Sequence, residues 1–197
     1  MFKFFKRAFD VFFSFLFLLI SSPMLIIFIL LIILIDFHSP FFFQERSGLN
    51  GRKIKIIKLQ TMKVFDGKLK ITKLGRLLRL TKIDELPQLF NVLIGNMSFI
   101  GPRPLYLEFN YYLKKAHKQR LTVKPGITGL AQIRVKDSTN WNKKFNYDVI
   151  YVRKNNFKLD FYIFFETIFM IIKSILFTKH RPNEIIDYKS SFNESYK

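Results

Sequence analysis

The sequence contains no cysteine, few acidic residues and only three histidines. Without cysteine the chain has no disulfides and no thiolate-ligated zinc, and His38, His117 and His180 are too scattered to suggest another metal site. The sequence also lacks GxxxxGKS/T, GxGxxG and HExxH, the motifs of P-loop nucleotide binding, dinucleotide binding and zinc peptidases. Several common classes of enzyme are therefore not supported.

Positive charge is abundant, because 33 Lys and Arg face 14 Asp and Glu and give a formal net charge of +19. Such an excess indicates an anionic partner, which would be nucleic acid, anionic lipid or a phosphorylated substrate. A nucleic-acid module needs a basic face interleaved with stacking aromatic side chains. Here the basic residues are spread widely and many of the 25 Phe lie in two apolar segments, so we expect no nucleic-acid partner.

The first apolar segment covers residues 8–35, and its 28 residues exceed the roughly 20 that cross a bilayer core. One alternative is a signal peptide, but the segment has no small-x-small cleavage site and continues well beyond Ser22. Another alternative is a single spanning helix. The 197 residues leave room for one compact domain besides this membrane element.

The flanking charges argue against a single crossing. Lys3, Lys6 and Arg7 precede the segment, and residues 36–80 carry eleven Lys and Arg against three acids, so the positive-inside rule places both flanks in the cytoplasm. Pro23 kinks a helix, and the hydroxyl of Ser22 could bond a carbonyl that Pro23 leaves free. We predict a re-entrant helix over residues 1–36, broken at Ser22-Pro23, with both ends on one face.

Residues 37–180 are predicted to form one cytoplasmic catalytic domain that is mainly helical and has a small β-hairpin. The expected elements are strands 41–46 and 52–59 joined at Asn50-Gly51, a loop 63–70, helices 72–80, 85–94 and 107–121, a loop 123–129, and a mixed polar segment 141–155. Residues 181–197 are predicted to form a loose tail.

The second apolar segment, Phe161–Phe177, carries a polar stripe. Glu166, Thr167, Lys173 and Ser174 recur at a spacing of seven residues, which is typical of an amphipathic helix lying in a membrane surface. The alternative is a core helix of the soluble domain.

Asp84 and Glu85 are adjacent carboxylates just before Pro87, at the predicted start of helix 85–94. The simple interpretation is that Asp84 caps this helix and Glu85 complements its dipole. The functional interpretation uses the same position, because a helix N-terminus attracts anions and two carboxylates there could share Mg²⁺ with a phosphate. An ionised Asp attacks phosphorus without a general base, so Asp84 and Glu85 are candidate catalytic and metal-binding residues.

Arg103 lies between Pro102 and Pro104, which restrict its backbone. A fixed guanidinium suits recognition of phosphate, although a surface arginine in a loop is the plain alternative. Arg79 precedes Asp84 by five residues and could reach the same phosphate, and Arg120 is a weaker candidate.

With these residues in view, the chain resembles the monotopic bacterial sugar transferases, also called polyprenyl-phosphate sugar-1-phosphate transferases, in the small form that is only the catalytic core. The resemblance covers nearly the whole chain. Its motifs are, in order, Ser22-Pro23, Ser39-Pro40, Gln44-x-Arg46-x-Gly48, Leu74-Gly75, Asp84-Glu85-Leu86-Pro87-Gln88-Leu89, Gly95-x-Met97-Ser98, Gly101-Pro102-Arg103-Pro104, Pro125-Gly126-Ile127-Thr128-Gly129-Leu130-Ala131-Gln132, Trp141, Asp148 and Tyr151.

The resemblance implies a re-entrant membrane helix and an active site on the cytoplasmic face of the bacterial inner membrane. It implies that Asp84 attacks the β-phosphorus of a UDP-sugar, that UMP leaves, and that polyprenyl (undecaprenyl) phosphate then removes the phosphosugar. Glu85 would be linked to Mg²⁺, and Arg103 and Arg79 would contact phosphate. Such enzymes begin capsule, O-antigen, exopolysaccharide or glycoprotein glycan assembly, so membrane lipid and later glycosyltransferases are expected partners.

The chain departs from the family pattern at Gln60, Asn96 and Val135-Lys136-Asp137, and its loop after Met62 is short. These changes leave Asp84 and Glu85 intact, so we expect activity, while the sugar and the glycan pathway stay open. The alternatives are an inactive homologue and a non-catalytic basic protein of the membrane surface. Simple lipid binding would weaken with salt and ignore UDP-sugars.

Overall fold

The computed structural model describes residues 2–65, 67–135, 137 and 139–177 of the chain. Its elements in chain order are α1 (Phe2–Leu31, continued by a π-helical turn Ile32–Asp36), β1 (Phe41–Ser47), β2 (Lys53–Leu59), β3 (Met62–Phe65), β4 (Lys68–Ile71), α2 (Lys73–Thr81), α3 (Gln88–Leu93), β5 (Ser98–Ile100), α4 (Phe109–Tyr112), β6 (Gly126–Thr128), α5 (Leu130–Arg134), α6 (Trp141–Lys154) and α7 (Phe157–Phe177), with short 3₁₀ turns at Leu49–Gly51, Ile83–Glu85 and His117–Thr122. The predicted tail 181–197 lies outside the described residues.

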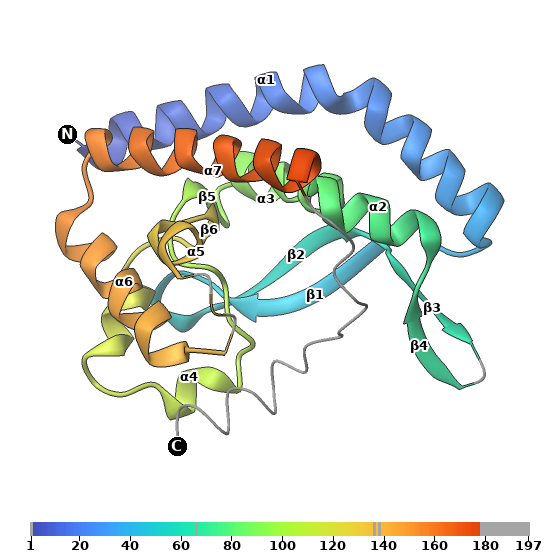
Figure 1. The fold of residues 1–197 in the computed structure, drawn as a ribbon. Helices are drawn as coiled ribbons and strands as arrows, with labels where there is room; N and C mark the ends of the chain where they lie inside the picture. The colour runs from blue at the N-terminus through green and yellow to red at the C-terminus, as the bar shows by residue number, and fades with distance from the viewer. Residues whose placement is uncertain (1, 66, 136, 138, 178–197) are drawn as a thin grey trace.

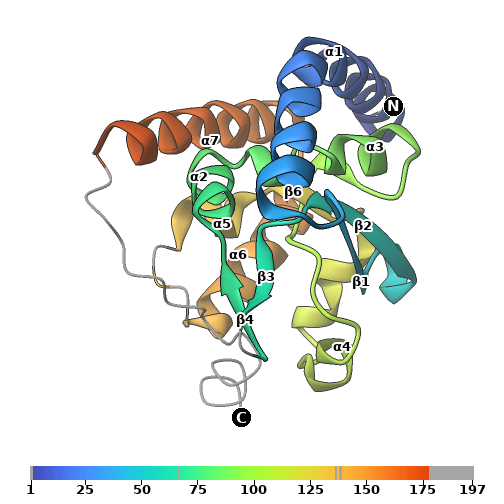
Figure 2. The ribbon, with the colours of Figure 1, turned by 90° about the vertical axis from the view of Figure 1, so that its right-hand side faces the viewer.

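The helices α7, α2 and α3 lie above the β1–β2 hairpin, and α1 arches over these helices (Figures 1 and 2). The main core sits between the helices and the hairpin, and the aromatic rings of Phe13 and Phe17 of α1 pack against it. Its buried members are Ile54, Ile56, Leu89, Val92, Met97, Phe99, Ile100, Leu130, Tyr151 and Ile163. A predominantly helical fold with a β-hairpin, as the sequence predicted, is confirmed.

The predicted hairpin of residues 41–59 is confirmed. Strands β1 and β2 pair antiparallel with Phe41 opposite Leu59 and Ser47 opposite Lys53. Asn50 and Gly51 have positive φ angles of 55° and 75° in the connection, a region that Asn and Gly adopt most readily.

Two segments predicted as loops are strands. Residues 63–65 and 68–70 belong to a second antiparallel hairpin, β3–β4, in which Val64 faces Leu69. The many lysines of this segment are the reason that it reads as a polar loop in the sequence. Residues 126–128 form β6, which pairs in parallel with β5. This parallel pair joins segments that are distant in sequence, so local patterns did not indicate it.

The helical predictions were partly right. Helix α2 is present and Thr72 caps it, because its hydroxyl accepts a hydrogen bond from the Gly75 amide. The predicted helix 107–121 is wrong, since only the short α4 and a 3₁₀ turn form there. Leu105, Phe109 and Leu113 in this region pack instead on Trp141 and Phe145 of α6.

Helix α1 together with its π-helical turn, Phe2–Asp36, is long and apolar enough to cross a membrane. The predicted break at Ser22-Pro23 does not divide the segment into two helices, because the chain stays helical through Pro23. Figure 1 shows α1 instead as one arched helix over the other elements. Ser22 Oγ donates a 2.8 Å hydrogen bond to the carbonyl of Leu19, the group that an amide at position 23 would have bonded. Length, composition and exposure of this helix indicate a membrane protein.

Both ends of α1 are attached to the rest of the chain. Near its start, the Arg7 guanidinium donates to the carbonyls of Val92 and Leu93 at the end of α3, at 2.6 and 2.7 Å. At the far end, Asp36 accepts a 2.7 Å hydrogen bond from the Thr72 hydroxyl at the start of α2. The arch therefore leaves the domain and returns to it.

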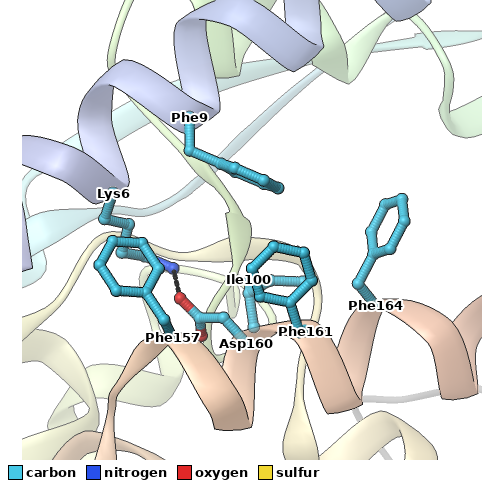
Figure 3. A pocket seen from close by; sticks show the side chains of 7 residues that line it. All are labelled: Lys6, Phe9, Ile100, Phe157, Asp160, Phe161 and Phe164. Atoms are coloured by element: carbon cyan, nitrogen blue, oxygen red, sulfur yellow. Dashed lines mark hydrogen bonds and ion pairs between the residues drawn. The ribbon is translucent and has the colours of Figure 1, made fainter.

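Helix α7 is also tied to α1. Figure 3 shows Lys6 reaching Asp160 through a small hollow between aromatic rings of the two helices, and the two charged groups are 2.5 Å apart. One face of α7 is buried through Ile163, while Phe165 and Phe169 are exposed. The helix thus combines a face that packs on the core with an apolar exposed face.

Candidate active site

Asp84 and Glu85 lie in the 3₁₀ turn between α2 and α3. Helix α2 ends where Lys82 adopts a left-handed conformation with φ of 61°, and α3 follows Pro87, which lacks an amide hydrogen and needs no partner there. The predicted helix start is thus shifted, and the side chain of Asp84 does not cap it. The turn leaves both carboxylates on the same short segment with different surroundings.

Glu85 lies between two cationic side chains. Its Oε1 accepts hydrogen bonds from Lys58 Nζ of β2 at 2.8 Å and from Arg103 Nη2 at 2.9 Å. Burial alone would raise the pKa of Glu85, but the charges of Arg103 and Lys58 outweigh it and hold that pKa well below its usual range. Glu85 is therefore a fixed anion that joins three separate segments.

Asp84 has the opposite environment. Its side chain is buried, and within the described part of the chain its Oδ1 has no hydrogen-bond partner. Burial, and then the neighbouring negative charge of Glu85, raise the pKa of Asp84 to about 6, although Lys58, Lys82 and Arg79 act against this shift. Two adjacent carboxyls with pKa values moved in opposite directions are typical of an active site.

Arg79 of α2 and Arg103 of the loop after β5 add positive charge near this pair. Arg79 Nε donates a 2.8 Å hydrogen bond to Thr61 Oγ1, and its charge acts on Asp84. Arg103 is half-exposed, so part of its guanidinium faces outward beside Glu85. The structure thus brings Arg103 into contact with Glu85 and places Arg79 where its charge acts on Asp84, and their contact with a phosphate stays a prediction.

Arg120 corrects one prediction. We expected it to contact phosphate, but its guanidinium is buried and forms a 2.9 Å ion pair with Asp148 of α6. Its Nη2 donates a 2.6 Å hydrogen bond to the backbone carbonyl of Arg103. Arg120 therefore lies behind Arg103 and supports the backbone of this residue.

Lys58 is the site residue that sequence reasoning missed. It contacts Glu85, and burial lowers its pKa although the Glu85 carboxylate acts in the opposite direction. Lys58 has the same parity along β2 as the buried Ile54 and Ile56, and side chains two residues apart in a strand share a face. A lysine in the register of the apolar face was the signal that could have identified it.

Among the described residues, the departures from the family pattern make no contact with Asp84 or Glu85 that the structure shows. Gln60 donates to the carbonyl of Met62, Asn96 is exposed, and Val135 is buried. Lys136 lies outside the described residues.

The two carboxylates of the site fit a Mg²⁺ ion that is shared with a phosphate, but not one held by protein ligands alone. The described residues contain no cluster of three or more His, Asp and Glu that could hold a metal. Mg²⁺ is commonly held by one or two carboxylates together with substrate phosphates and water, and Asp84 offers a buried oxygen without a partner in the described chain. Asp84 and Glu85 thus suit a metal that arrives with a phosphate substrate.

Comparison with known proteins identifies the family of this chain. Residues 1–174 match the family described as bacterial sugar transferase, and the chain belongs to this family. The uncharacterized sugar transferase EpsL of Bacillus subtilis (strain 168) is 38% identical over 178 residues, which cover 86% of this chain and 88% of that protein.

Two further relatives have names that state a reaction. A UDP-glucose:undecaprenyl-phosphate glucose-1-phosphate transferase of Klebsiella pneumoniae is 37% identical over 183 residues, 84% of this chain and 39% of that protein. A UDP-N-acetylgalactosamine-undecaprenyl-phosphate N-acetylgalactosaminephosphotransferase of Aeromonas hydrophila is 32% identical over 190 residues, 87% of this chain and 44% of that protein. The chain thus spans less than half the length of these two relatives, and their names agree with the predicted class, a phosphotransferase.

Proposed function

We propose that the protein transfers a sugar-1-phosphate from a UDP-sugar to polyprenyl (undecaprenyl) phosphate and releases UMP, as the first membrane step of bacterial glycan assembly. The observation that carries this proposal is the buried Asp84 carboxylate, with an oxygen that has no partner in the described chain, beside the fixed Glu85 and its two cations. The names of the relatives support the two substrates.

In the proposed first step, the ionised Asp84 attacks the β-phosphorus of the UDP-sugar. A bond forms between the Asp84 oxygen and phosphorus, the bond from phosphorus to the oxygen bridging to UMP breaks, and UMP leaves with that electron pair. The phosphosugar stays on Asp84. In the second step a terminal phosphate oxygen of polyprenyl phosphate attacks the same phosphorus, and the Asp84 carboxylate is released.

The surrounding residues serve this reaction through charge and position, which supply most of the catalysis in phosphoryl transfer. Arg103 and Arg79 would contact phosphate oxygens, and Lys58 together with Glu85 keeps Arg103 in place. When bound, Mg²⁺ held by Asp84 and Glu85 would neutralise further charge on the phosphates.

We also propose that α1 is re-entrant and that the site lies at the cytoplasmic face of the inner membrane. The support is that Arg7 and Asp36, at opposite ends of α1, are both bonded to the same domain. Helices α1 and α7 lie on the same side of the molecule (Figure 1), and both carry many exposed apolar side chains. A lipid-linked phosphate could therefore approach the site from this side. Glycosyltransferases that extend the product are the partners that this chemistry requires.

UMP release from a panel of UDP-sugars tests the proposal, with detergent-solubilised protein, Mg²⁺ and undecaprenyl phosphate. We expect release with at least one sugar by the wild type, and at least about a thousandfold less by Asp84→Asn, because the nucleophile is lost. The matched control is Glu45→Gln, an exposed carboxylate paired with Lys53, which should retain activity.

A second readout is the mass of the protein after incubation with donor alone, which should rise by one phosphosugar on Asp84. Wild-type UMP release by Asp84→Asn would remove Asp84 as the nucleophile. Silence across a broad panel, with folded protein, would favour an inactive homologue or a membrane-surface binding protein.

A further inference from the structure

We propose that the buried ion pair between Arg120 and Asp148 is a positioning device that fixes Arg103 against the substrate phosphate. The inference rests on the proposed function, because it assumes that Arg103 binds the phosphate being transferred. It gives Arg120 a role through another residue, in place of direct contact with substrate.

The contacts form one continuous path from the interior to the site. Asp148 of α6 accepts from Arg120 Nε at 2.9 Å, and Arg120 Nη2 donates to the Arg103 carbonyl at 2.6 Å. The guanidinium of Arg103 in turn donates to Glu85 at 2.9 Å. The path thus ends beside Asp84, the proposed nucleophile.

The Arg103 carbonyl is held differently from its neighbours. Pro102 and Leu105 have their carbonyls bonded to the backbone amides of Gly126 and Ser47, at 3.0 and 2.8 Å. Arg103 is instead held by a charged side chain, and its next residue, Pro104, has no amide to contribute to a local turn. Of these three carbonyls, that of Arg103 is therefore the one whose hydrogen bond comes from a side chain, and this side chain is distant in sequence.

Stability alone is a weak reason for such an anchor. The side chains of Arg120 and Asp148 are 3% and 4% exposed, and a buried ion pair gains little net stability because desolvation offsets the attraction. The ion pair does hold the planar guanidinium of Arg120 in a fixed orientation, so that it donates in a fixed direction. The ring of Phe145 adds to this hold, because Arg120 Cζ lies 5.3 Å from the centroid of that ring. Lysine in the same place would keep the charge but lose the two-directional geometry.

A double-variant experiment tests the inference, with kcat/KM for UMP release as the readout. We expect Arg120→Lys to lower kcat/KM by up to about a hundredfold, because small displacements of a substrate-binding group have effects of this size. In Arg103→Ala the anchor no longer matters, so Arg103→Ala/Arg120→Lys should match Arg103→Ala within about twofold. The Mg²⁺ concentration for half-maximal activity should not change in Arg120→Lys.

Arg153→Lys is the matched control, because Arg153 is exposed on α6 and donates to Gln119 of the 3₁₀ turn that also contains Arg120. Asp148→Asn disturbs the same ion pair from its other side, since it keeps an acceptor for Arg120 but removes the charge. Its loss of kcat/KM should likewise disappear in the Arg103→Ala background. It also serves if Arg120→Lys is not recovered as folded protein.

Multiplicative losses in the double variants would overturn the inference, since they would mean that Arg120 acts on general structure or directly on substrate. Unchanged kcat/KM in Arg120→Lys and Asp148→Asn would overturn it too. If Arg103→Ala itself keeps full activity, the assumption about Arg103 fails. If the wild type releases no UMP, the proposed function fails.

Discussion

Adjacent carboxyls become chemically different in this protein because their neighbours differ. Glu85 faces two cations and stays charged, whereas Asp84 is buried next to the Glu85 charge. The fold therefore keeps a destabilised anion where the proposed reaction needs a nucleophile. Three predictions at the residue scale follow from this contrast.

Asp84→Asn should make the folded protein more stable while it removes activity. The folded pKa of about 6 lies above the ordinary aspartate value of 3.8, so the proton is held more tightly in the folded state. This contribution to stability is lost as the pH rises through 6. Without metal at pH 8, the free energy of unfolding should rise by up to about 3 kcal/mol. Denaturant unfolding with EDTA measures this, and a less stable variant would contradict it.

The pH profile of kcat/KM should have an acid limb near pH 6. Attack needs ionised Asp84, and its ionised fraction falls as the pH drops through its pKa of about 6, while Glu85 stays charged. The kcat/KM profile reports groups of the free enzyme. A limb near pH 4 instead would show that burial does not destabilise the ionised form of Asp84.

Glu85→Gln should act mainly through the metal. The amide keeps an acceptor for Lys58 and Arg103 but loses the charge that would attract Mg²⁺. We expect the Mg²⁺ concentration for half-maximal activity to rise by about ten- to a hundredfold. A Mg²⁺ titration that matches the wild type would exclude this role, and Glu45→Gln again serves as control.

At the scale of elements, the contact between α2 and the peptide of Thr61, between β2 and β3, places Arg79. A Cβ on Gly75 would lie 2.1 Å from the carbonyl oxygen of Thr61, so the helix backbone rests directly on that peptide. Thr61 Oγ1 also accepts from Arg79. The small residue in α2 thus sets the distance between this helix and the site.

Gly75→Ala should therefore harm both stability and activity. The methyl group meets backbone rather than a flexible side chain, so α2 must move, at a cost of about 1–3 kcal/mol, and Arg79 moves with it. Thermal unfolding and UMP release are the measurements. Arg76→Ala, at an exposed position of the same helix, is the control, and a Gly75→Ala protein that matches it would refute the packing argument.

At the scale of the whole molecule, the proposed membrane topology rests on the two attachments of α1. Because the chain has no cysteine, Lys3→Cys and Lys118→Cys each introduce a single thiol, one at the start of α1 and one at an exposed position of the domain. In a re-entrant arrangement both thiols face the cytoplasm. Both should react with a membrane-impermeant maleimide only after cell lysis.

Labelling of Lys3→Cys in intact cells, with Lys118→Cys protected, would show a spanning helix and contradict the re-entrant arrangement. A thiol on an outward loop of a spanning protein verifies that the reagent reaches the outer face.

The sequence alone predicted the apolar first helix, the β1–β2 hairpin and the candidates Asp84, Glu85, Arg79 and Arg103. These features are local, since hydrophobic length, Asn50-Gly51 and a proline-flanked arginine act within a few residues. Tertiary structure alone decided the parallel pairing of β5 with β6, the inward position of Lys58 and the burial of Arg120. Each depends on contacts between segments far apart in the chain, where burial and charge partners determine what a side chain does.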